Sequence, residues 1–224
     1  MNVKHLFVGL AGLVGVAANA SAATADLGTF TLDYDDSTIL GGLSFSFSSG
    51  GNVVGFGWNL PSSLGVAGGA GSTQTFVLPS FTVTAKAGNT LSGPASSFLG
   101  NLVFGEYSGA TTSASGSAMV SFDGGPAVAA GGALAKTVTS SLPTFSGGYF
   151  SGTAESPIAS FVTFAVTNAS LTLSIDGPGF GSILAQPQNE LKFSFLSTPV
   201  PLPAAVWLLA SALGAMGTIT RRRV

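Results

Sequence analysis

Residues 23 to 198 of this 224-residue chain repeat one pattern, in which apolar side chains alternate with small polar ones. In SLTLSIDG, Leu171, Leu173 and Ile175 alternate with Thr172 and Ser174. Successive side chains of a β-strand point to opposite faces of a sheet, so a period of two predicts a strand with one buried face. The same alternation recurs in TFTLDY, GLSFSFSS, TFVLPSFTVTA, SAMVSFDG and ELKFSFLS.

Glycine doublets separate these runs, and they indicate turns because glycine tolerates positive φ angles. Short alternating strands with glycine-rich turns predict an all-β fold, a single antiparallel β-sandwich of jelly-roll-like type over residues 23 to 198. A segment of this length can bury one core, so we expect one domain. Two segments, 93–106 and 125–136, are ambiguous between helix and strand.

The composition excludes several kinds of chemistry. Charged residues make up 7% of the chain, against about 25% in an ordinary soluble domain. Residues 23 to 198 hold nine acidic residues and three lysines, and this balance excludes nucleic acid as a partner, because phosphates require clustered Lys and Arg. The chain has no cysteine and its one histidine is His5, which excludes thiolate catalysis, a Ser-His-Asp triad and a zinc site in the domain. Carboxylate, Tyr or Lys chemistry and calcium binding remain.

The first 22 residues predict a secretory signal peptide. A basic start precedes an apolar run over residues 6–18, which is the layout of such peptides. The small residues Ala20 and Ala22 predict cleavage between Ala22 and Ala23. We therefore expect export by the Sec machinery and removal of the leader by signal peptidase. A buried N-terminal helix is the alternative, against which the glycines of the run argue.

The other end of the chain predicts a membrane-spanning helix over residues 204 to 220, which carry no charge. A helix of this length reaches about 26 Å, close to the thickness of a hydrocarbon core of about 30 Å. Arg221, Arg222 and Arg223 follow it, and the positive-inside rule keeps them cytoplasmic while the body of the protein is exported. A buried core helix is the alternative, but nothing polar lines either face of the segment.

A proline-rich strip, STPVPLP, precedes this helix. Proline disfavours helical geometry, so the strip is expected to be extended and accessible to a protease. Its motif, followed by a short apolar helix and a terminal arginine cluster, resembles the VPLPA variant of the PEP-CTERM sorting signal. The motif residues are Val200, Pro201, Leu202, Pro203 and Ala204.

The resemblance covers residues 199–224 and implies a protein exported by a Gram-negative bacterium. It implies that an exosortase holds the tail in the inner membrane, cuts near the motif, and leaves the protein at the cell surface or in the extracellular matrix, often beside exopolysaccharide. The chain departs from the more widespread form of the motif, because Leu202 stands where that form has glutamate. The resemblance therefore implies an exosortase of the variant type.

An acidic cluster is the candidate metal site. Asp33, Asp35 and Asp36 lie within four residues, and calcium takes several oxygen ligands from flexible loops. The spacing matches no EF-hand pattern, so a solvated group of like charges is the alternative.

Two further kinds of site involve sugars. A glycosidase needs two carboxyl groups about 5–10 Å apart, and Glu106, Glu155 and Glu190 are candidates besides the aspartates. Exposed aromatic side chains stack on sugar rings, and the candidates for this role are Trp58, Tyr107 and Tyr149. Trp58 alternates with Phe56 and Val54, which favours a place in the core instead.

The sequence thus predicts an exported, non-enzymatic surface or matrix protein associated with exopolysaccharide. The alternatives are a carbohydrate-binding module, with or without calcium, and a carboxylate-based glycan hydrolase.

Overall fold

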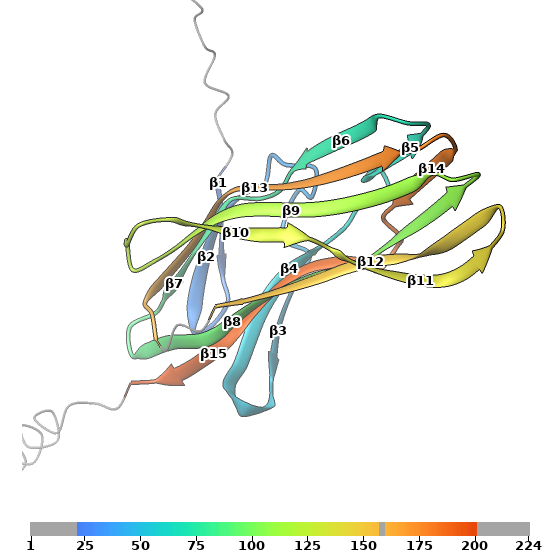
Figure 1. Ribbon diagram of the computed structural model, residues 1–224. Coiled ribbons are helices and arrows are strands. Elements are labelled where there is room, and N and C mark those ends of the chain that lie inside the picture. Colours follow the sequence, from blue (N-terminus) through green and yellow to red (C-terminus); the bar gives the residue numbers. More distant parts are fainter. Residues whose placement is uncertain (1–21, 157–159, 201–224) are drawn as a thin grey trace, which may run out of the picture.

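Two β-sheets face each other in the computed structural model, which describes residues 22–156 and 160–200 (Figure 1). The regular structure of these residues consists of strands, apart from one 3₁₀ turn at Gly50–Asn52. The strands are β1 Ala22–Asp26, β2 Phe30–Asp35, β3 Phe45–Ser49, β4 Val53–Asn59, β5 Gly65–Gly68, β6 Ser72–Val77, β7 Phe81–Ala85, β8 Asn89–Tyr107, β9 Thr111–Phe122, β10 Val128–Ala133, β11 Ala135–Leu142, β12 Phe145–Ser156, β13 Thr163–Asp176, β14 Phe180–Leu184 and β15 Glu190–Pro199.

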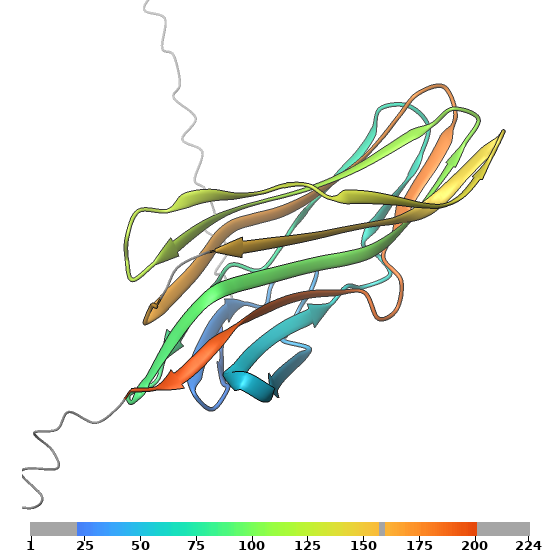
Figure 2. The same ribbon diagram turned by 60° about the horizontal axis from the view of Figure 1, so that its bottom comes forward.

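All pairs between these strands are antiparallel, and together they form a β-sandwich. Sheet A has the order β1-β2-β7-β13-β9-β10, with β6 also paired to β13. Sheet B has the order β11-β12-β8-β15-β4-β3, with β14 paired to β8 and β5 paired to β14. Figure 2 shows the two layers running along the same long axis. The predicted all-β sandwich is confirmed.

The core lies between the sheets and follows the alternation of the sequence. Leu171, Leu173 and Ile175 on β13 are fully buried, whereas Thr172 and Ser174 between them are not. On the other sheet β4 contributes a cluster of rings in edge-on contact, and Trp58 has 0% of its surface exposed. The prediction that Trp58 belongs to the core is confirmed.

Both ambiguous segments contain strands. Residues 93–106 lie within β8, which pairs with β12, β14 and β15 and is the longest strand described. Segment 125–136 contains β10 and the start of β11. Pairing with neighbours on both sides decides the conformation of β8, since local propensity is weaker than tertiary context.

The hairpin of β3 and β4 turns aromatic side chains outward. Phe45 and Phe47 share one face of β3, and their register partners are Gly57 and Gly55 on β4. The other face of β4 carries the buried Trp58, so both phenylalanines lie on the outer face of sheet B. Their rings lie over the two glycines, which have no side chain to occupy that space.

The predicted signal peptide and sorting tail lie almost wholly outside the described residues. The residues outside are 1–21, which include Ala20, and 201–224. The second range contains Pro201, Leu202, Pro203 and Ala204 of the motif, the predicted helix and the three arginines. Within residues 22–156 and 160–200 there is no helix long and apolar enough to cross a membrane. Ala22 and Ala23 open β1, where they pair with Asp35 and Tyr34.

Strand β8 extends along most of the long axis of the sandwich (Figure 1). Pro199 at the end of β15 pairs with Asn89 at the start of β8, and the Val200 amide donates to the Gly88 carbonyl at 2.9 Å. Tyr107 ends β8 at the opposite extremity. At about 3.3 Å per residue, the 19 residues of β8 separate these two ends by about 60 Å.

Candidate binding surface

Three aromatic side chains form a row across the outer face of sheet B, at the end of the molecule farthest from Val200. Tyr107 ends β8 and pairs with Phe145 on β12 on one side and with Phe180 on β14 on the other. On the same three strands Phe104, Phe150 and Ile183 face the core and are buried. Each lies an odd number of residues from the row, so the row is on the opposite, outer face. Strand pairing therefore brings together three rings that lie up to 73 residues apart in the chain.

A second row of apolar side chains lies parallel to the first. Val103 on β8 pairs with Tyr149 on β12 and with Leu184 on β14, so this row faces the same side as Tyr107. We call these two rows the aromatic platform; its residues are Val103, Tyr107, Phe145, Tyr149, Phe180 and Leu184.

Small residues fill the space between the two rows. Gly105 pairs with Gly147 and with Ser182. A Cβ atom at Gly147 would lie 2.7 Å from Cζ of Phe145, and one at Gly105 would lie 3.4 Å from Cε2 of Tyr107. The rings of Phe145 and Tyr107 therefore lean over the glycines, with their centroids 4.8 Å apart and their planes at 42°.

The aromatic platform is uncharged, and all of its residues except the half-buried Phe145 are exposed. Tyr107 has 46% and Phe180 52% of its surface exposed. Such a surface can stack on flat ligands that have apolar faces and polar rims, while the tyrosine hydroxyls and Ser182 supply hydrogen bonds.

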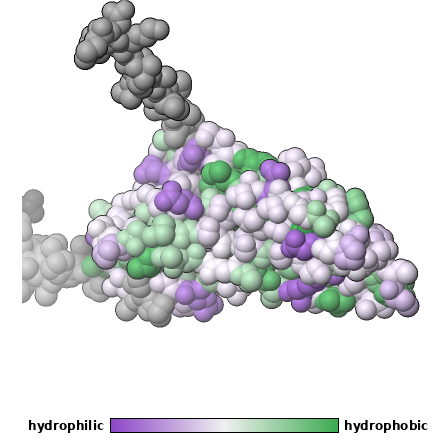
Figure 3. Space-filling model, turned by 45° about the horizontal axis from the view of Figure 1, so that its top comes forward, coloured by the Kyte–Doolittle hydropathy of each residue, from purple (hydrophilic) through white to green (hydrophobic). Residues whose placement is uncertain are grey.

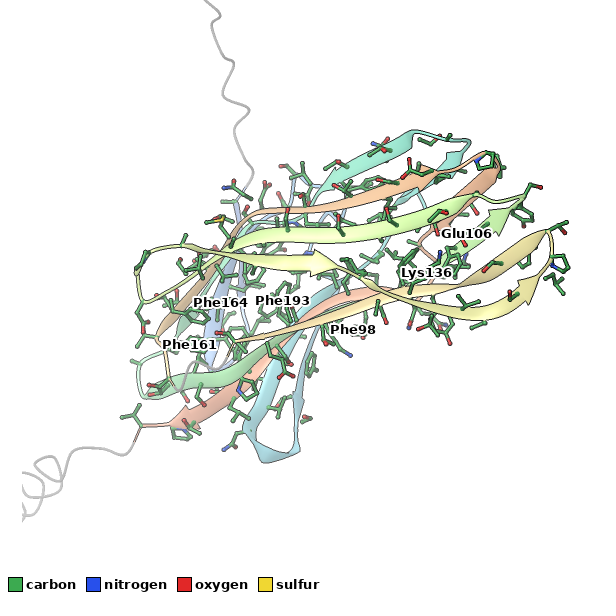
Figure 4. All side chains as sticks on the ribbon, in the orientation of Figure 1. Phe98, Glu106, Lys136, Phe161, Phe164 and Phe193 are labelled. Carbon is green, nitrogen blue, oxygen red and sulfur yellow. The ribbon has the colours of Figure 1, made fainter. Side chains whose placement is uncertain are left out.

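A partly buried ion pair between Glu106 and Lys136 lies behind the platform, on the inner side of sheet B (Figure 4). Glu106 points inward from β8 and accepts hydrogen bonds from the Thr112 amide at 2.6 Å, from the Thr112 hydroxyl at 2.8 Å and from Lys136. Burial raises the pKa of Glu106, but the hydrogen bonds from Lys136 and Thr112 outweigh it, so the net pKa is lowered. Lys136 also lies over the Phe104 ring, 4.6 Å from its centroid.

The three aspartates proposed for calcium are placed at the end of β2. Asp33 accepts a hydrogen bond from Thr24 at 2.6 Å, and Asp35 accepts from the amide and hydroxyl of Ser37 at 2.9 and 2.5 Å. Both carboxylates thus have partners within their own turn or hairpin. Among the described residues there is no group of three or more Asp, Glu, His or Cys side chains arranged to hold a metal ion.

The three glutamates proposed for glycan hydrolysis lie far apart. Glu155 pairs with Ser96, ten residues along β8 from Glu106, which corresponds to about 33 Å. Glu190 lies beside the Leu191–Leu99 pair, which places it about 20 Å from Glu106 and about 16 Å from Glu155 by strand spacings. None of these separations fits the range of about 5–10 Å that a pair of catalytic carboxylates requires.

Of the aromatic candidates, Tyr107 and Tyr149 lie on the platform and Trp58 does not. Phe145 and Phe180 also lie on the platform, although neither was among the aromatic candidates proposed from the sequence. A signal was present for Phe145, because Gly147 in FSGG is its neighbour on the same face of the strand and has no side chain to cover the ring.

The outer face of sheet A differs in character. It is covered by Ser and Thr from neighbouring strands, some joined across the sheet, as in the Thr75–Thr172 pair at 3.0 Å and the Ser117–Ser170 pair at 2.9 Å. In the space-filling view of Figure 3 the visible surface is mostly of near-neutral hydropathy. Its hydroxyl groups provide the polar surface that the few charged residues cannot.

Comparisons of the chain with protein-family models, with curated proteins and with solved structures return no match.

Proposed function

We propose that this protein is an exported, non-enzymatic surface or matrix protein that binds extracellular polysaccharide through the aromatic platform. The observation that carries the proposal is the uncharged row of Tyr107, Phe145 and Phe180, in which Tyr107 and Phe180 are exposed and the rings of Tyr107 and Phe145 lie over glycines. Pyranose rings present apolar C–H faces and hydroxyl rims, which match such a row.

The charge of the domain favours a sugar over other ligands with flat rings. Nucleic-acid bases also stack on aromatic side chains, but their phosphates require nearby cations. The platform residues carry no charge, and Lys136 is engaged by Glu106 behind them. A neutral polysaccharide can stack on the rings and needs no cation beside them.

The position of the platform supports delivery by the C-terminal tail. Under the proposed sorting route, an exosortase recognises the strip from Val200 to Ala204 while the helix and the arginines hold the chain in the inner membrane. The described domain ends at Val200, beside the start of β8. A domain attached there would present its platform about 60 Å away from the point of attachment.

Two finer points belong to the same proposal. The sandwich is assigned to the jelly-roll-like type, in which connections between consecutive strands pass from one sheet to the other, as from β8 to β9. Calcium at Asp33, Asp35 and Asp36 stays a hypothesis, and a rise in the melting temperature on adding calcium, reversed by EDTA, would support it.

A binding measurement tests the platform. The wild-type protein and a Y107A/F180A double variant would be mixed with insoluble cellulose and chitin, and run in gels containing exopolysaccharide from the producing cells. We expect the wild type to bind at least one polysaccharide and the double variant to bind it about tenfold or more weakly, since each stacked ring contributes about 0.5–1.5 kcal/mol.

The matched control is Val77→Ala, which trims an exposed apolar side chain on the outer face of sheet A and should leave binding unchanged. Unchanged binding by the double variant would contradict the role of the platform. Loss of self-association in the double variant, without any effect on polysaccharide, would assign the platform to contacts between copies instead.

A mass measurement tests the sorting route separately. The intact mass of the protein from its own cells would be compared between strains with and without the exosortase. We expect an N-terminus at Ala23 and a C-terminus near Val200 to Pro203 that depends on the enzyme. A mass that still includes Arg221 to Arg223 in both strains would make the tail a permanent anchor.

A further inference from the structure

A cavity of about 540 Å³ lies between the two sheets, on the side of the sandwich where β10 faces β12. In the described part of the chain β10 pairs with β9, and β12 pairs with β8 and β11, but no ladder joins β10 to β12. The sandwich is therefore open along this seam. The volume falls in the range of about 300–1,000 Å³ that is usual for small-molecule sites.

The cavity exists because small residues occupy the inward positions of four strands. Register and alternation place these residues on the core side of each sheet. Elsewhere in the interior the corresponding positions carry large rings such as Phe30, Phe56 and Trp58. The small inward residues that line the cavity are Ala95 and Ser97 on β8, Gly116 and Ala118 on β9, Ala130 and Gly132 on β10, and Gly152 and Ala154 on β12.

Large apolar side chains form the inner wall of the cavity. Phe122 and Phe164 stack with their centroids 4.9 Å apart, and Phe193 lines the same space from sheet B. Figure 4 shows Phe164 and Phe193 in the interior, toward the end of the molecule opposite Glu106. An apolar molecule that enters along the seam would meet these rings.

The seam leaves apolar surface open to solvent. Val128 faces inward, opposite Val120 of β9, yet 55% of its surface is exposed. An inward apolar side chain is normally covered by the facing sheet. Here the small side chains of β12 do not reach it, so apolar surface remains for a ligand to cover.

The charges around the cavity select among apolar ligands. None of the three lysines of the described residues lines it, and Glu155 is its one charged lining residue. Glu155 alternates with the inward Ala154, so its carboxylate faces outward, and a fatty-acid carboxylate in the cavity would find no cation there. We infer that the β10–β12 seam binds an uncharged single-chain lipid, such as a long-chain alcohol or ester.

A displacement assay on the protein purified from its own cells tests the inference. The neutral fluorophore 1-aminoanthracene would be bound first, and then 1-hexadecanol or hexadecanoate would be added. We expect hexadecanol to displace the fluorophore at least tenfold more effectively than hexadecanoate. Failure of hexadecanol to displace it, or equal displacement by both, would overturn the inference.

Two tryptophan variants locate the site. Ala130→Trp fills the cavity from β10 and should weaken hexadecanol binding at least tenfold, whereas Ser115→Trp places the same ring on the outer face of sheet A and should have no effect. Circular dichroism checks the fold, and Val128→Trp, at an exposed inward position, replaces Ala130→Trp if that variant does not fold. Undiminished hexadecanol binding in the folded variant would overturn the assignment. A changed oligomeric state with unchanged hexadecanol binding would also overturn it, because the seam would then be a contact between copies.

Discussion

At Gly57 a phenylalanine ring occupies the space in which any other residue would have its side chain. A Cβ atom there would lie 2.5 Å from Cζ of Phe45 and 2.5 Å from the carbonyl oxygen of Leu191. The ring can move, but the carbonyl belongs to the ladder between β4 and β15 and cannot. Glycine at this position is thus required by its neighbours rather than by its own φ angle.

We expect Gly57→Ala to destabilise the protein by about 1–3 kcal/mol, the cost of overpacking a site whose backbone cannot shift. The measurement is urea denaturation followed by tryptophan fluorescence. The matched control is Gly50→Ala, where an added Cβ meets nothing within 4 Å. Equal stability of the two variants would show that the ring and carbonyl at Gly57 yield easily.

The inward-facing Glu106 makes the stability of the protein depend on pH. Because its pKa is lowered on folding, the protonated form is favoured in the unfolded chain, and stability rises with pH through this range. The contribution of Glu106 is complete above the pKa of an unfolded glutamate, about 4.3. It is lost as the pH falls through the lower folded value.

Glu106→Gln should therefore be less stable than the wild type near pH 7, by about 1–3 kcal/mol for the charged acceptor that is lost, and the difference should shrink toward pH 3. Urea denaturation at a series of pH values measures it. Asp26, whose pKa Lys86 and the Gly28 amide lower in the same direction, is present in both proteins and cancels. A difference independent of pH would show that Glu106 stabilises by packing alone.

At the scale of the strands, the central and edge positions differ in how many ladders hold them. Strand β13 pairs with β9 on one side and with β6 and β7 on the other. Strand β10 pairs with β9, and no partner lies on its other side among the described residues.

Hydrogen exchange of the whole protein should follow this order. We expect amides of residues 170–176 to exchange at least a hundredfold more slowly than those of residues 128–133, because opening an edge strand breaks one ladder and opening a central strand breaks two. Peptide-resolved mass spectrometry measures both segments at once. Similar exchange rates would mean that β10 is covered in solution, by a lipid in the seam or by another chain.

The alternation of the sequence predicts which side chains of a strand share a face, but not always which face is buried. Alternation correctly predicted that Leu171, Leu173 and Ile175 share a buried face. It also grouped Phe45 with Phe47, but a period of two does not say which face meets the core. That choice depends on the register with Gly55 and Gly57, which is a property of two strands together.

The same limit applies to the binding surface. Tyr107 and Tyr149 could be proposed from the sequence as exposed aromatics. Phe180 lies far from both in the chain, and only the pairing of β14 with β8 places it beside Tyr107. The separation of Glu106, Glu155 and Glu190 follows from register in the same way.

At the scale of the whole molecule, the sandwich is elongated along β8. A compact chain of this size has a radius of gyration of about 16 Å, which for a sphere means a diameter of about 40 Å. We expect X-ray scattering of the mature protein to give a maximum dimension of about 60 Å. A value close to that of a sphere would contradict the extended course of β8.

The pairing of β15 with the start of β8 also determines how the domain would respond to mechanical load. If the tail is held at the cell and the platform is held by polysaccharide, tension enters at Val200 and leaves near Tyr107, at opposite ends of two antiparallel strands. The ladder from Leu191–Leu99 to Pro199–Asn89 then lies across the line of force and is loaded in shear, so its hydrogen bonds share the tension instead of opening one at a time. Strand β15 is also paired to β4 on its other side, so the strand that takes up the pull is held by two ladders.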